Sequence, residues 1–239
     1  MPILLPPRHS WDSFPEVVLH SEINVVKQHP MYAAAKSGDS DAALQLVRDT
    51  LSSKALDALR AFADLSNPVL MPVHALEDTG VNAIPFALAE ELASRLQWRV
   101  ETTVVQANLV GHTGASGFHR LANQAYFQGS VTAGSNYVLV DDFVGQGGTL
   151  ANLRGHLLTG GAGVVGATVL TGKLHSVKLA LLPETLADLR SKHGQELEAW
   201  WHARFGHAFD GLTESEARYL FRTPNADRVR DRIVTAEHG

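Results

Sequence analysis

The 239-residue chain contains no cysteine, which excludes a disulfide framework and a thiolate metal site. It has no apolar run near the roughly 20 residues that cross a bilayer, and its N-terminus lacks the charged and apolar regions of a signal peptide. Basic residues number 20 against 25 acidic ones, and the net charge of −5 argues against a nucleic-acid or membrane-surface partner. We therefore expect a soluble, cytoplasmic protein.

Apolar residues make up 45% of the chain and charged residues 19%, as in a globular protein with a sizeable core. Residues 1–28 show no regular pattern. The segment 30–51 predicts two helices broken at Ser37–Gly38, with Asp39 or Ser40 as the cap of the second helix. A single helical hairpin cannot bury its own apolar face, so we expect it to pack on the rest of the protein.

From residue 66 the pattern alternates between short apolar strands and amphipathic helices. Strands are expected at 68–73, 99–106, 137–140 and 163–172, with helices at 81–96 and 148–160. Residues 107–125 are polar and dotted with glycine, which is typical of a long loop. After residue 183 the chain reads as helical, with a break at Gly194 and a capping-box pattern at Thr213 and Glu216.

This alternation predicts an α/β fold, with a mostly parallel sheet covered by helices on both faces. The expected division is an N-terminal helical extension over 1–65, a core over 66–182, and a C-terminal helical segment over 183–239 that packs on the core.

The stretch "NYVLVDDFVGQGGTLANL" (136–153) places Asp141 and Asp142 after an apolar strand and before a glycine-rich turn and a helix. Ligands of parallel sheets bind beyond the carboxyl ends of the strands. A helix N-terminus attracts phosphate, and glycines let the backbone approach it closely. The acids can bind hydroxyl groups or a metal ion. No Lys-Ser/Thr pair follows the glycines, and acids precede them, so neither a Walker loop nor a dinucleotide fingerprint is present.

The segment "VLVDDFVGQGGT" resembles the signature of the type I phosphoribosyltransferases. The segment "VLMPVHALEDTGVN" (69–82) is similar to the family's pyrophosphate loop, and residues 107–125 fall where the family has a flexible catalytic loop. The resemblance implies that Asp141 and Asp142 bind the ribose hydroxyls of phosphoribosyl pyrophosphate, directly or through Mg2+. The 5-phosphate would be held by Gly145, Gln146, Gly147, Gly148 and Thr149, and the pyrophosphate by the loop containing His74, Glu77, Asp78, Thr79 and Gly80.

The implied reaction transfers a phosphoribosyl group to a nitrogenous acceptor, or runs in reverse, with small-molecule substrates and a homodimeric enzyme. His119 and Arg120 would act from the loop that closes over the substrate and neutralise the departing pyrophosphate. A zinc site built from His112 and His119 is less favoured, because their spacing fits no helix face or tight turn used for zinc.

One departure from the family keeps alternatives open. Gly145 and Gln146 stand where the family usually has hydroxyl residues, so two side-chain donors to the phosphate are absent. A non-catalytic sensor of phosphoribosyl pyrophosphate or nucleotides on the same fold is one alternative. Hydrolysis or salvage of a nucleoside 5′-phosphate is another. Both terminal segments are candidates for the hood over the acceptor.

Overall fold

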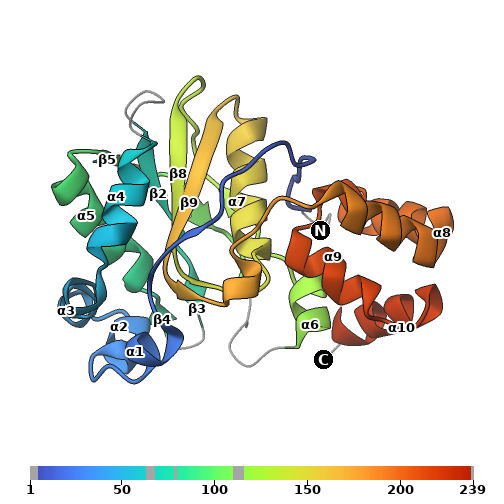
Figure 1. Ribbon diagram of the computed structural model, residues 1–239, viewed down its shortest axis with the longest axis horizontal. Coiled ribbons are helices and arrows are strands. Elements are labelled where there is room, and N and C mark those ends of the chain that lie inside the picture. Colours follow the sequence, from blue (N-terminus) through green and yellow to red (C-terminus); the bar gives the residue numbers. More distant parts are fainter. Residues whose placement is uncertain (1–4, 63–67, 78–79, 110–115, 238–239) are drawn as a thin grey trace.

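The computed structural model describes residues 5–62, 68–77, 80–109 and 116–237. A parallel five-stranded sheet with the order β1-β9-β8-β2-β5 forms its centre (Figure 1). This sheet confirms the expected fold class. Its strands are β1 (Val18–Ser21), β2 (Val69–Pro72), β5 (Arg99–Val100), β8 (Asn136–Val144) and β9 (Gly163–Gly172).

Helices cover both faces of the sheet, because neighbouring residues of each strand point to opposite sides. Met71 and Leu139 pack with Leu153 on one face, whereas Val138 packs with Leu88 on the other. The first face is covered by α7 (Gly148–Thr159), and the second by α3 (Ser40–Thr50), α4 (Ser53–Arg60) and α5 (Ile84–Leu96). Figure 1 shows this division, with α7 on one side of the strands and α3, α4 and α5 on the other.

The N-terminal segment contributes a strand as well as helices. The expectation of an irregular chain up to residue 28 is wrong at 18–21, where β1 pairs with β9 at Val18↔Thr168 and Leu19↔Val169, and at 23–27, which is helical. Two short helices follow, α1 (Ile23–Lys27) and α2 (Tyr32–Lys36). Asp39 is the cap of α3, as predicted, and accepts the N–H of Ala42 at 2.9 Å.

Two short strand pairs and one short helix lie at the carboxyl edge of the sheet. They are the hairpin of β3 (Leu76–Glu77) and β4 (Gly80–Val81), the pair of β6 (Val105–Gln106) and β7 (Phe127–Gln128), and α6 (Gly117–Ala122). The strand predicted over 99–106 is wrong, since its two ends join different sheets. The segment 107–125, predicted to be a loop, contains the helix α6. Ser116 caps the N-terminus of this helix, and its side chain accepts the N–H of His119. Residues 110–115, including His112, lie outside the described residues.

The C-terminal helices build an apolar cluster of their own with α6. They are α8 (Pro183–Phe205), α9 (Glu214–Phe221) and α10 (Ala226–Glu237), with the short 3-10 helices η2 (Leu174–Ser176) and η3 (Phe209–Gly211) before and between them. Leu121, Trp201 and Ile233 meet in this cluster, which lies beyond α7 in Figure 1. Gly194 interrupts α8 with φ 77°, as the sequence indicated. Within the described ranges, no helix is long and apolar enough to span a membrane.

Candidate functional site

The acidic pair lies inside β8 rather than after it. The predicted strand end at residue 140 is wrong, because Asp141 pairs with Val169 and Phe143 with Thr171 as β8 continues alongside β9. Asp141 is buried, and its carboxylate accepts the N–H of Asp142 at 2.8 Å. The Asp142 carboxylate accepts a hydrogen bond from Lys36 Nζ at 3.0 Å, which joins the N-terminal helix α2 to the site.

The two acids differ in their electrostatic surroundings. Burial raises the pKa of Asp141 well above its ordinary value, and the adjacent charge of Asp142 raises it further. Lys36 opposes this effect only in part. Asp141 therefore holds its proton unusually strongly, and a cation or hydroxyl donors bound beside it would favour the ionised form.

The glycine-rich loop between β8 and α7 is fixed by its carbonyl groups. Ser176 Oγ donates to the carbonyl of Gly145 at 2.5 Å, and Thr213 Oγ1 donates to the carbonyl of Gln146 at 2.6 Å. Gly147 precedes α7 with φ 82° and ψ 4°, a left-handed conformation in which a side chain would also collide with Leu179. The first N–H groups of α7 have no acceptor within the helix, so this loop offers an anion both donors and the favourable end of the helix dipole.

A buried ion pair, whose two residues line the same cavity as the loop, lies beside the loop. Arg8 Nη1 lies 2.6 Å from the Glu216 carboxylate, and Arg8 Nε donates to Asn152 of α7 at 2.5 Å. A further contact joins Arg8 Nη2 to the carbonyl of Gly148 at 3.4 Å. The capping box predicted for Thr213 and Glu216 is confirmed. The sequence did not predict the ion pair of Glu216 with Arg8.

A cavity of about 420 Å3 lies in front of the acids and the loop. It brings together Arg120 and seven other residues that the sequence predicts as site residues: Asp141, Asp142, Gly145, Gln146, Gly147, Gly148 and Thr149. The N-terminal helices supply part of its wall through Lys27, Tyr32 and Lys36. Lys27 Nζ lies 4.9 Å from the ring centroid of Phe143 on the same wall.

Other predicted site residues lie apart from this cavity. His119 neighbours Arg120 on α6 but lines a separate hollow with residues of α10. His74 is exposed, and its carbonyl accepts the N–H of Gln106 at 2.8 Å. Gly80, with φ 123°, packs closely against the backbone of Ser37. Glu77 belongs to β3, while Asp78 and Thr79 lie outside the described residues.

The acidic pair has the donors that a magnesium ion uses. In the described ranges, no cluster of three or more His, Asp or Glu residues could hold a metal by itself. Mg2+ is usually held by one or two carboxylates together with substrate phosphates and water. Asp141 and Asp142 therefore fit a magnesium ion that is bound together with a phosphorylated ligand.

Comparison with known proteins finds a family model, two relatives and a solved structure that match this chain. The model of the phosphoribosyl transferase domain matches residues 80–209. Protein TraN of Escherichia coli is 40% identical over 231 residues, which is 97% of this chain and 52% of that protein. An uncharacterized protein of Haemophilus influenzae is 37% identical over 152 residues, or 63% of this chain and 34% of that protein. This chain thus spans about half or less of these relatives.

Among solved structures, a crystal structure of adenine phosphoribosyltransferase matches with a TM-score of 0.38 and 16% identity, covering 63% of this chain and 75% of that one. The family match spans the acids, the glycine-rich loop and α6. It leaves out Arg8, Lys36 and Glu216, which come from segments on either side of the matched residues.

Proposed function

Because the chain belongs to the phosphoribosyltransferase family, we propose that it transfers the phosphoribosyl group of phosphoribosyl pyrophosphate to a nitrogenous acceptor, or catalyses the reverse reaction. The observation that carries the proposal is the acidic pair of Asp141 and Asp142 in one cavity with the loop 145–149. In the transfer, the acceptor nitrogen forms a bond to ribose C1 with its lone pair. The bond from C1 to oxygen breaks, pyrophosphate leaves with that electron pair, and the nitrogen loses its proton to solvent.

The two halves of the cavity suit the two ends of the phosphoribosyl group. The loop that ends at Gly147 and the first turn of α7 would hold the 5-phosphate through backbone N–H groups and the Thr149 hydroxyl. Asp141 and Asp142 would accept hydrogen bonds from the ribose hydroxyls. Holding both ends fixes the position of C1, and such positioning is a large part of catalysis for a reaction between two bound molecules.

Arg120 is placed to balance charge that develops on the leaving group. It lines the cavity, and its guanidinium lies so close to Gly145 that a Cβ on this glycine would stand 2.7 Å from Arg120 Nη1. Burial lowers the pKa of Arg120 from an ordinary value so high that the group stays cationic at neutral pH. A cation fixed on the wall of this cavity would stabilise the transition state as pyrophosphate departs.

Magnesium would be held by Asp141 and Asp142 together with phosphate oxygens of the substrate, and it would supply positive charge that offsets the charge of pyrophosphate. Lys36 donates to Asp142, so α2 and a bound ligand share this carboxylate. The N-terminal helices are thereby coupled to occupancy of the ribose site.

A non-catalytic sensor of phosphoribosyl pyrophosphate is the second candidate. It is favoured by Gly145 and Gln146, which supply no hydroxyl groups to the phosphate loop, and by the Lys36–Asp142 pair, which can report occupancy through α2. A sensor and an enzyme share the binding site and differ in whether pyrophosphate is released.

Two measurements test the proposal. Calorimetry should detect phosphoribosyl pyrophosphate binding in the presence of Mg2+, and Asp141→Asn with Asp142→Asn should weaken it at least tenfold, about 1.4 kcal/mol. A pyrophosphate-release assay with a panel of nitrogenous acceptors should then show turnover. Binding without release on any acceptor would favour the sensor. Unchanged affinity in the double variant, with normal circular dichroism, would contradict the ribose-binding role of the acids.

A further inference from the structure

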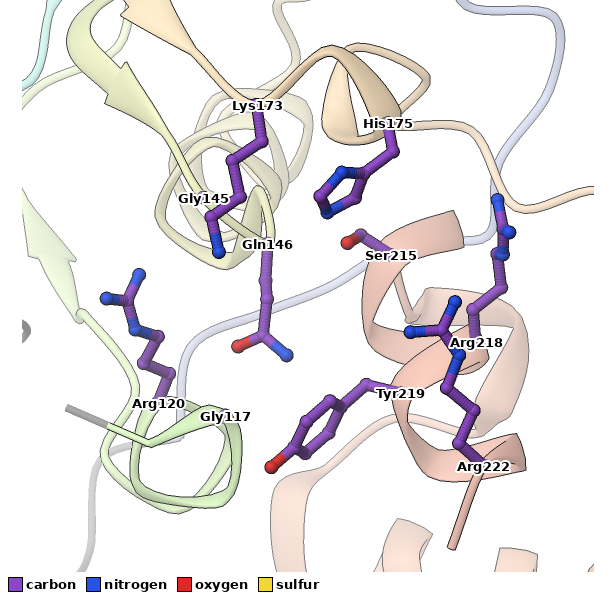
Figure 2. Close-up of a pocket in the computed structure, with 10 residues that line it drawn as sticks. All are labelled: Gly117, Arg120, Gly145, Gln146, Lys173, His175, Ser215, Arg218, Tyr219 and Arg222. Atoms are coloured by element: carbon purple, nitrogen blue, oxygen red, sulfur yellow. The ribbon is translucent and has the colours of Figure 1, made fainter. Parts of the chain in front are cut away.

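A second cavity, of about 470 Å3, adjoins the first at the glycine-rich loop. The loop residues Gly145 and Gln146 line both cavities, as does Arg120 of α6. The remaining walls come from the segment after β9 and from α9, as Figure 2 shows. A molecule in this second cavity would therefore lie next to a ligand held by the loop.

Four of the side chains around this second cavity are cationic. Lys173 comes from the segment after β9, Arg218 from α9, and Arg222 directly follows α9, while Arg120 lies across the cavity on α6 (Figure 2). None of the described residues that line it is acidic, in contrast to the first cavity with its two aspartates. Across the described ranges, the side chains of Lys173, Arg218 and Arg222 form no ion pair. Like charges gathered without counter-ions create a positive potential that attracts an anion.

Polar and aromatic groups accompany these cations. Gln146 reaches into the second cavity (Figure 2), and its side-chain oxygen is buried with no hydrogen-bond partner in the described structure. A buried acceptor without a donor is costly, and rotation of the amide would turn the oxygen toward an N–H group of a ligand. The Tyr219 ring packs against Gly117 and lies 5.1 Å from the Phe118 ring, which leaves a flat aromatic surface at the edge of the cavity.

We propose that the acceptor of the phosphoribosyl group is a nitrogen compound that carries a carboxylate or phosphate group, and that Lys173, Arg218 and Arg222 bind this acidic group. The inference rests on the proposed function, because it assigns the second cavity to the acceptor. The acidic group anchors the molecule on α9, an N–H group meets the side-chain oxygen of Gln146, and the reacting nitrogen is directed past the loop toward ribose C1. Arginine suits this task because its planar fork binds carboxylates and phosphates with two hydrogen bonds.

The first experiment measures the anion site without turnover. Inorganic phosphate is titrated by calorimetry into protein saturated with ribose 5-phosphate, so that the loop at 145–149 is already occupied. We expect one phosphate to bind, and Arg218→Gln with Arg222→Gln to weaken it at least tenfold. The control is Lys54→Gln with Arg60→Gln on α4, which makes the same change of charge away from both cavities. Absent phosphate binding, or equal weakening in the control, would overturn the proposal.

The second experiment separates an acidic acceptor from a free anionic effector. Pyrophosphate release is measured with matched pairs, uracil against its 6-carboxyl derivative and pyridine-3-carboxamide against pyridine-3-carboxylate. We expect the acidic member of a pair to react at least tenfold faster, and Arg218→Gln with Arg222→Gln to abolish that preference. Equal rates within both pairs would overturn the assignment to the acceptor. Weaker binding of phosphoribosyl pyrophosphate in the arginine variant would overturn it too, by assigning the cavity to the donor.

Failure of the proposed function gives a different result. If ribose 5-phosphate and phosphoribosyl pyrophosphate both fail to bind, the phosphoribosyl reaction is excluded. Phosphate titrated into the free protein still compares the wild type with the arginine variant. A difference there keeps an anion site but removes its role in the transfer, whereas no difference rejects the site itself.

Discussion

The Arg8 guanidinium and the Glu216 carboxylate lie 2.6 Å apart, with their side chains only 2% and 3% exposed, although 208 positions separate them in the chain. The Glu216 carboxylate also accepts the N–H of Thr213, and Arg8 donates to Asn152. The pair thus ties the N-terminal segment and α9 to α7, next to the glycine-rich loop.

Breaking this pair from one side should destabilise the protein. Arg8→Met leaves a buried carboxylate without a counter-charge, and such changes cost about 3–5 kcal/mol in the free energy of unfolding. Glu216→Gln added to Arg8→Met should recover part of the loss. Urea denaturation measures both variants. The control is Arg60→Met, which breaks an exposed pair with Asp57 and should cost less than about 1 kcal/mol. Similar losses for Arg8 and Arg60 would contradict the structural role of the buried pair.

Gly147 and Gly134 offer a matched comparison of backbone conformation. Both have positive φ, 82° and 77°, but nothing lies within 4 Å of a Cβ on Gly134, whereas one on Gly147 collides with Leu179. Alanine at either position adds a strain of about 1–2 kcal/mol. We expect only Gly147→Ala to weaken ribose 5-phosphate binding, by at least tenfold in calorimetry. Equal affinities in the two variants would show that the turn at 147 does not shape the proposed binding site for the 5-phosphate.

The raised pKa of Asp141 makes stability depend on pH in a defined direction. The folded protein holds this proton more strongly than the unfolded chain, whose carboxyl has a pKa near the ordinary 3.8. The contribution of Asp141 to stability is therefore complete below that pH and is lost as pH rises through the raised pKa. Asp141→Asn should melt at a higher temperature than the wild type at pH 7.5, with the difference vanishing near pH 4. A lower melting temperature at pH 7.5 would contradict the shift.

His119 and Arg120 were both predicted to act in catalysis, and the structure points them into different hollows. Arg120→Ala should reduce turnover at least tenfold more than His119→Ala, because only Arg120 lines the cavity with the acids. Binding of phosphoribosyl pyrophosphate should change much less than turnover in Arg120→Ala, since the charge that Arg120 balances develops during the reaction. Steady-state kinetics and calorimetry on the same preparations make the comparison. Equal loss of turnover in the two variants would place His119 in the site as well.

Local sequence patterns predicted the features that depend on neighbouring residues. Strand β9 has the expected bounds, Gly163–Gly172. A helix cap at Asp39 or Ser40 and a helix break at Gly194 could also be predicted from the sequence, because a short polar side chain and a glycine act on the backbone beside them. The parallel sheet followed from apolar strands that alternate with helices.

Features set by distant residues could not be predicted in the same way. β8 continues past Val140 because β9 lies beside it, and this pairing overrides the weak strand tendency of two aspartates. β1 was missed because a four-residue edge strand carries too short a pattern. Phe86 fits the apolar spacing of α5 and is nevertheless 42% exposed. The ion pair of Arg8 and Glu216 could not be predicted, because no local sequence pattern links residues 208 positions apart.

The bonds that fix the glycine-rich loop have a consequence for the order in which the chain folds during synthesis. Domains form from the N-terminus onward as the ribosome releases them, and strands β1, β2, β5, β8 and β9 are all complete by residue 172. The hydrogen bond to the carbonyl of Gln146 can form only after Thr213 has been synthesised, and the ion pair of Arg8 only after Glu216. A nascent chain therefore carries the whole sheet and its two aspartates through some 40 further residues before the loop acquires its final supports. We expect it to gain its affinity for phosphate only at the end of that interval.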